Sequence, residues 1–164
     1  MPYGARCKPA GLRLALGEPL SQATSQETLI LTLTNISGAG CDLQGYPGLS
    51  LVDRAGVALP FTVRWGGTQM LTTSAPALVP LAPGATAYFG ITKWACVGHW
   101  RGVAHTFEVI PPNDYYPLSL TTARYPAVGY CPPGDPGHTV NVTPVEPGLR
   151  SVLNGHLTAR PGSP

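Results

Sequence analysis

Four cysteines offer the clearest chemistry in this chain of 164 residues. Cys7 and Cys41 are 34 positions apart, and Cys96 and Cys131 are 35 positions apart. None belongs to a Cys-x-x-Cys pair, the spacing of zinc knuckles and of thioredoxin-like redox sites. Four cysteines allow three pairings, and the sequence alone does not choose among them. The matching intervals favour disulfides Cys7–Cys41 and Cys96–Cys131, which would require an oxidising compartment. Four buried free thiols in a reducing cytosol are the alternative.

The four histidines do not form a metal-binding pattern. His99, His105, His138 and His156 are scattered, with no His-x-x-x-His helix and no pairing with a cysteine at ligand spacing. We interpret them as solvated loop histidines, and we expect neither a metal site nor a cofactor.

Catalytic residues are also hard to find. The chain has no Gly-x-Ser-x-Gly elbow of the kind that carries a nucleophilic serine. Acid–base chemistry commonly needs two carboxylates held close together. The candidates are few and mostly in turns, where aspartate often caps its own backbone: Asp42, Asp53, Glu108, Asp114 and Asp135. We expect no catalytic residue.

Aromatic side chains are the remaining candidates for a contact surface. Tyr115 and Tyr116 lie in the stretch PPNDYYP, within a segment of about 27 residues (111–137) that shows little strand pattern. Such a length is unusual in a compact sandwich, and long loops on a rigid scaffold often carry binding. Neighbouring residues of an extended segment point to opposite sides, so at most one of the two tyrosines can easily pack inward. With Trp100 and Tyr130 they form our predicted binding set; the alternative is that these rings only cap the open end of the core.

The elements that position these side chains have a period of two. The runs LILTLT (29–34) and AYFGIT (87–92) alternate along the chain, which places one face of each strand in a core. Turns rich in glycine and proline separate such runs. The sequence predicts seven or eight strands, near 11–17, 27–35, 48–53, 57–65, 77–81, 85–94, 103–110 and 138–145.

Short strands separated by regular turns predict an all-β fold, an immunoglobulin-like antiparallel β-sandwich with two disulfides. No internal repeat or long linker divides the chain, so we expect one domain over residues 1–164 with its core at about 7–147. Residues 148–164 should form a short turn near 148–154 and a frayed tail.

Composition narrows the class further. Charged residues are only 11% of the chain and the net charge is +2, so the basic stripe that nucleic acid requires is absent. No apolar run reaches the roughly 18–20 residues that span a bilayer. The opening residues MPYGARC have no apolar signal core. The chain is therefore either cytosolic or the product of a precursor that has lost its export segment, and the cysteines favour export.

The order of motifs resembles the bacterial domain-of-unknown-function family 4232, chiefly actinobacterial exported proteins and lipoproteins. The resemblance covers about residues 7–147. It rests on Cys7, on LTLTN (31–35) and CDLQGYPGLSLVD (41–53), on VPLAPGATAYFGITKW (79–94), and on Cys131 before VNVTPVEPG (140–148). It implies an immunoglobulin-like sandwich at the cell envelope, with no established reaction and no catalytic residues, and a lipid anchor in the native precursor.

The function expected from these observations is that of an exported, non-enzymatic binding or protein-interaction module of the cell envelope, with an unknown protein or envelope ligand as its partner. A secreted protease inhibitor is the alternative, because small disulfide-bonded β domains can present a rigid proline-rich loop to a protease. An enzyme of unknown class is the third hypothesis.

Overall fold

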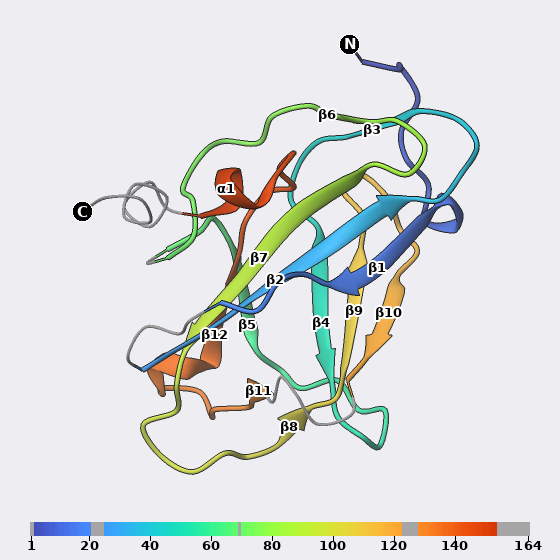
Figure 1. The fold of residues 1–164 in the computed structure, drawn as a ribbon. Coiled ribbons are helices and arrows are strands. Elements are labelled where there is room, and N and C mark those ends of the chain that lie inside the picture. Colours follow the sequence, from blue (N-terminus) through green and yellow to red (C-terminus); the bar gives the residue numbers. More distant parts are fainter. Residues whose placement is uncertain (1, 21–24, 69, 123–127, 154–164) are drawn as a thin grey trace.

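Two β-sheets face each other across one core in the structure, a computed structural model that describes residues 2–20, 25–68, 70–122 and 128–153 (Figure 1). The larger sheet has the order β1-β2-β7-β12-β5, and the smaller has the order β10-β9-β4. In Figure 1 the larger sheet, with its long strands β2 and β7, lies in front of the smaller sheet. The predicted all-β sandwich is confirmed.

The strands of the larger sheet are β1 (Leu12–Leu16), β2 (Gln26–Asn35), β5 (Thr62–Trp65), β7 (Thr86–Trp94) and β12 (Thr139–Val142). Those of the smaller are β4 (Gly48–Val52), β9 (Thr106–Ile110) and β10 (Leu118–Thr121). Two short pairs join β3 (Cys41–Leu43) to β6 (Val79–Leu81) and β8 (Val103–Ala104) to β11 (Val128–Gly129). Two 3₁₀ turns, η1 (Pro9–Gly11) and η2 (Pro136–His138), and one short helix, α1 (Leu149–Val152), complete the described elements.

The core follows the predicted alternation. Leu31 of β2 lies opposite Phe89 of β7, and both side chains are buried between the sheets. Phe107 and Val109 of β9 fill the same core from the smaller sheet. Burying side chains of this size stabilises the fold by about 1.5–3 kcal/mol each.

The outer face of the larger sheet is partly covered by a second, smaller cluster. This cluster consists of Ile30 of β2, Val152 of α1, and Leu71 from the chain between β5 and β6. Gly90 of β7 makes room for them, because a Cβ at this position would lie 2.8 Å from the Leu71 side chain and 3.0 Å from that of Val152. The turn predicted near 148–154 is thus α1, and it covers this face; residues 154–164, including the predicted tail and His156, lie outside the described residues.

Both predicted disulfides are present. Cys7 is bonded to Cys41, and Cys96 is bonded to Cys131. The first ties the N-terminal arm to β3, and the second ties the end of β7 to the chain after β11. Two disulfides indicate an oxidising environment.

Several strand predictions need correction. The sheets are not purely antiparallel, because β5 pairs with β12 in parallel, Thr62 opposite Thr139. The strand predicted over 57–65 begins only at Thr62; Pro60 has no backbone N–H to give to a ladder. The strand predicted over 103–110 divides at His105, whose N–H bonds to the Val52 carbonyl.

The segment 111–137 is also more ordered than predicted. It contains β10, β11 and η2 within its described residues, so the described part of the chain holds twelve strands instead of seven or eight. No described helix is both long and apolar enough to cross a membrane.

Candidate functional site

The connection between β9 and β10 displays the two adjacent tyrosines. Tyr115 is 87% exposed and Tyr116 is 72% exposed. Neither ring packs inward, which fits the expectation that at most one of them could. The stretch is therefore a loop that carries two accessible aromatic rings side by side in sequence.

This tyrosine loop, residues 111–117, is held by its own polar residues. The Asp114 carboxylate accepts a hydrogen bond from the Tyr115 N–H at 2.7 Å, and its other oxygen forms an ion pair with Arg6 Nε at 3.5 Å. The Asp114 side chain is only 5% exposed, so this ion pair is well shielded on one side. Asn113 adopts φ +61° and donates from Nδ2 to the Gln44 carbonyl at 3.1 Å. The tyrosine loop is thus attached to both the N-terminal arm and the loop after β3.

The N-terminal arm that supplies Arg6 is itself fixed. The Asp42 carboxylate accepts hydrogen bonds from the backbone N–H groups of Tyr3 and Gly4, at 2.8–3.0 Å. The Cys7–Cys41 disulfide anchors the arm one residue after Arg6. Sequence reasoning did not find this support, because Arg6, Asp42 and Asp114 are far apart along the chain and no motif links them.

Trp100 and Tyr130 do not join the tyrosines. They lie beside the β8–β11 pair, at the opposite end of β9 from the tyrosine loop (Figure 1). Tyr130 is buried, with Phe61 edge-on at 4.9 Å and His138 at 5.6 Å between ring centroids. Trp100 is half-exposed and lies against Gly129, where a Cβ would come within 2.2 Å of the indole. The four predicted contact residues therefore do not form one surface, and Tyr130 packs inside the molecule.

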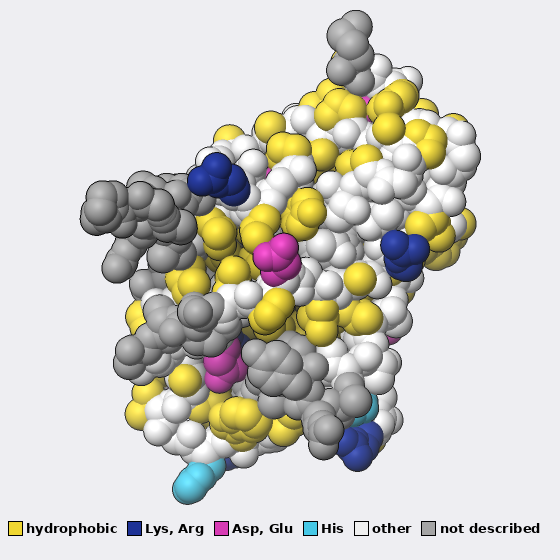
Figure 2. Space-filling view, in the orientation of Figure 1, with side chains coloured by type: hydrophobic (Ala, Val, Ile, Leu, Met, Phe, Trp, Pro, Cys, Tyr) yellow, Lys and Arg dark blue, Asp and Glu magenta, His cyan; other side chains and the backbone are white. Residues whose placement is uncertain are grey.

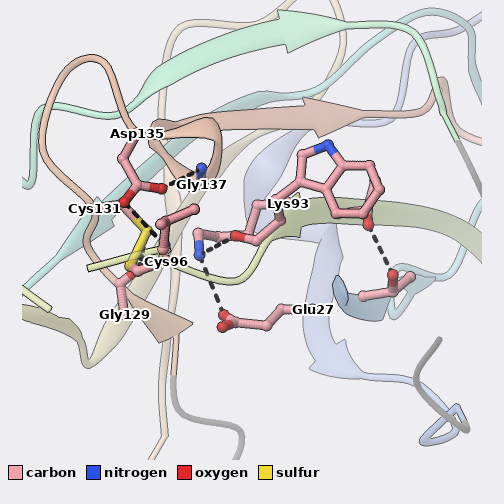
Figure 3. Close-up of polar contacts among 11 residues, drawn as sticks. Glu27, Lys93, Cys96, Gly129, Cys131, Asp135 and Gly137 are labelled. Carbon is pink, nitrogen blue, oxygen red and sulfur yellow. Dashed lines mark hydrogen bonds and ion pairs between the residues drawn. A yellow bond between two sulfur atoms is a disulfide. The ribbon is translucent and has the colours of Figure 1, made fainter. Parts of the chain in front are cut away.

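A buried ion pair lies near the Cys96–Cys131 disulfide (Figure 3). Lys93 Nζ donates to the Trp94 carbonyl at 2.8 Å and pairs with Glu27 Oε1 at 3.4 Å. Burial lowers the pKa of Lys93 and raises the pKa of Glu27, while each charge opposes the shift of the other. The sequence held a signal for this pair: Lys93 continues the core stripe of β7, and Glu27 continues that of β2, opposite it in register.

Asp135 organises the neighbouring loop. Its carboxylate accepts from the N–H of Gly137 at 2.9 Å and from the N–H groups of Val97 and Gly98 at 3.0 and 3.3 Å. These donors, the Gly137 N–H first, lower the pKa of Asp135. Gly137 must be glycine here, because a Cβ would lie 2.4 Å from Cys131 Sγ. The cluster in Figure 3 is a structural one that holds the chain around the disulfide.

The described residues hold no group of three or more His, Cys, Asp or Glu side chains that could bind a metal ion. The predicted carboxylates are dispersed: Asp42 holds the N-terminal arm, Asp53 caps its own turn, and Asp114 and Asp135 hold loops at opposite ends of the sandwich. These carboxylates therefore hold loops and turns in place and do not meet at one site.

The family model described as "Domain of unknown function (DUF4232)" matches residues 7–146. No curated protein and no solved structure matches the chain.

Proposed function

We propose that this chain, which belongs to the DUF4232 family over residues 7–146, is an exported, non-enzymatic interaction module of the cell envelope that contacts a protein partner through Tyr115 and Tyr116. Export is supported by the two disulfides, since such bonds persist in oxidising compartments. The family description itself supplies no activity.

The observation that carries the proposal is the exposure of two adjacent tyrosines on a loop with fixed ends. Tyrosine is a favoured contact residue, because it offers a large amphipathic surface with few rotatable bonds. A loop that is already held in place loses little conformational entropy when a partner binds. Exposed rings of this kind contribute little to the core, so folding does not require tyrosine at these two positions.

The proposal is tested by replacing each tyrosine with alanine. The melting temperature should stay within a degree or two, because neither ring is buried. Binding of the purified protein to an isolated envelope fraction should weaken by about 1.4–2 kcal/mol, roughly ten- to thirtyfold. Val97→Ala is the matched control, since Val97 is 82% exposed and lies in the loop held by Asp135 at the other end. Equal loss in the control, or no loss in either tyrosine variant, would rule out the tyrosine loop as the contact.

The protease-inhibitor alternative is favoured by the same loop, because a fixed loop with an exposed tyrosine suits the deep apolar pocket of a chymotrypsin-like protease. An inhibition assay with chymotrypsin separates the two functions. Inhibition of chymotrypsin that is lost in Tyr115→Ala or Tyr116→Ala would establish the inhibitor. Rapid cleavage of the protein, or no effect on the protease, would favour the interaction module.

A further inference from the structure

A pocket of about 300 Å³ opens on the outer face of the larger sheet, away from the tyrosine loop. Ile91 of β7 points into the core, so its neighbour Thr92 points outward. Thr92 lies opposite Thr28 of β2 and Asn141 of β12, and Trp94 lies opposite Gln26. Directly opposed residues of antiparallel strands project on the same face. Four of the pocket's lining residues, Gln26, Thr92, Trp94 and Asn141, are therefore grouped by the strand register itself.

The chain after β5 forms one wall of this pocket. Trp65 is followed by Gly66 at φ +114° and by Gly67, where a Cβ would lie 1.9 Å from the Thr72 carbonyl oxygen. The two glycines allow the chain to turn over the sheet, which brings Thr68 to the pocket. Asn141 Nδ2 donates to the Gly66 carbonyl at 3.1 Å and holds this wall in place.

Most of the lining residues are polar in type and nearly all are uncharged, although much of the surface that they expose is apolar. The lining consists of three threonines, two side-chain amides, the half-exposed ring of Trp94, Pro136 and Lys93. The Lys93 ammonium is already used by the Trp94 carbonyl and by Glu27. Figure 2 shows isolated charged side chains among hydrophobic and uncharged polar ones on this face of the molecule.

One acceptor in the lining has no donor among the residues that the structure describes: Oε1 of Gln26 is buried and no described group donates a hydrogen bond to it. A buried acceptor without a partner costs free energy in the unliganded protein, and a ligand hydroxyl could satisfy it.

We propose that this pocket binds one neutral sugar unit. A sugar ring has hydroxyls that pair with threonine and amide side chains, and an apolar C–H face that packs on an indole. The volume is at the lower end of the range of roughly 300–1,000 Å³ for small-ligand sites, which suits one ring. An apolar ligand would leave Gln26 Oε1 unpaired, and an anionic ligand would find no uncommitted cation among the described lining residues.

The proposal is tested by nuclear magnetic resonance on the full ¹⁵N-labelled chain, titrated separately with glucose, galactose, mannose and N-acetylglucosamine. At least one of these sugars should bind with a dissociation constant in the millimolar range. Its binding should shift the indole N–H signal of Trp94 and the side-chain amide signals of Gln26 and Asn141. Absence of these shifts with all four sugars would overturn the proposal, as would stronger shifts with glucuronate than with glucose.

Two variants sharpen the test. Trp94→Ala should weaken sugar binding at least tenfold by removing the stacking surface. Gln26→Met keeps the side-chain length but removes the unpaired oxygen, so it should leave the melting temperature unchanged or higher while it weakens binding several-fold. Tyr115→Ala is the control and should bind sugar as the parent does. If Trp94→Ala fails to fold, Gln26→Met decides alone, and binding equal to that of the parent would overturn the proposal.

Discussion

The buried ionisable side chains of the described residues have different surroundings. Lys93 and Glu27 form an ion pair, and Lys93 also donates a hydrogen bond to the Trp94 carbonyl. Glu146 is buried and its backbone pairs with that of Tyr88, but no group in the described part of the chain donates a hydrogen bond to its Oε2. Burial raises the pKa of Glu146. The ionised form of this carboxyl is therefore less favourable in the folded state than in the unfolded state.

Glu146→Gln should be more stable than the parent protein at neutral pH. Above the ordinary pKa of 4.5 the folded protein keeps the Glu146 proton more readily than the unfolded chain. The folded state then binds more protons, so the contribution of Glu146 to stability is present below 4.5 and is lost as the pH rises through the raised pKa. Glutamine cannot ionise and avoids this loss.

Urea unfolding as a function of pH measures the effect. The stability of Glu146→Gln and of the parent should converge as the pH falls to 4.5 and below, and should separate above it. A constant difference at every pH would show that titration of Glu146 does not contribute.

At the scale of elements, hydrophobic alternation was sufficient to predict the long strands. β2 and β7 were predicted within a residue or so because each has nine or ten residues of unbroken pattern. β3, β8 and β11 have two or three residues, too few to show a period. β10 does alternate, with Leu118 and Leu120 turned toward the core, but it has only four residues and follows the turn-rich PPNDYYP. Because the strand pattern is so short and lies next to turn-forming residues, the sequence predicted no strand here.

The candidate contact residues could be predicted only in part, because local sequence does not report long-range contacts. That at least one of the adjacent tyrosines is exposed follows from local sequence, whereas the burial of Tyr130 depends on a long-range partner. It lies edge-on to Phe61, almost seventy positions away, and no local pattern reports such a contact. The ion pair between Arg6 and Asp114, which holds the tyrosine loop, depends on tertiary structure in the same way.

Asp114→Ala should loosen the tyrosine loop without unfolding the protein. It removes the acceptor of the Tyr115 N–H and the partner of Arg6, at a cost of about 1–2 kcal/mol. Limited proteolysis with chymotrypsin should then cleave after Tyr115 or Tyr116 several-fold faster than in the parent, because proteases act on segments that open locally.

Asp53→Ala is the matched control for that experiment. Asp53 also accepts backbone hydrogen bonds within its own turn, from Ala55 and Val57, but that turn does not contact the tyrosine loop. Cleavage at the tyrosines should be unchanged in this variant. Equal acceleration in both variants would mean that global stability, and not the local attachment, protects the loop.

At the scale of the whole molecule, the two disulfides fix opposite ends of the sandwich. Cys7–Cys41 holds the arm that supports the tyrosine loop, while Cys96–Cys131 lies beside the Lys93 ion pair and the turn capped by Asp135 (Figure 3). The similar intervals of 34 and 35 residues favoured this pairing over the two other possible ones, and the structure confirms it. The spacing could not predict which surface each bond supports, because this depends on how the two sheets bring distant segments together.

Removing either disulfide should destabilise the protein by about 3–4 kcal/mol, since each closes a loop with a sequence separation of 34 or 35 and restricts the unfolded chain accordingly. The double variants Cys7→Ser/Cys41→Ser and Cys96→Ser/Cys131→Ser avoid unpaired thiols, and urea unfolding gives both free energies. The two loops do not overlap in sequence, so the losses should add in the quadruple variant if it still folds.

The loops at the two ends of the sandwich should respond differently to removal of the two disulfides, even though the losses in stability are similar. Under conditions where both double variants remain folded, the loss of Cys7–Cys41 frees the arm that carries Arg6, so chymotrypsin should cleave at Tyr115 or Tyr116 faster in that variant than in the other. The loss of Cys96–Cys131 should instead loosen the loop at Val97 and Gly98, which the hydrogen bonds to Asp135 would still hold. Identical cleavage patterns in the two variants would show that the disulfides stabilise the fold as a whole without a local role at either end.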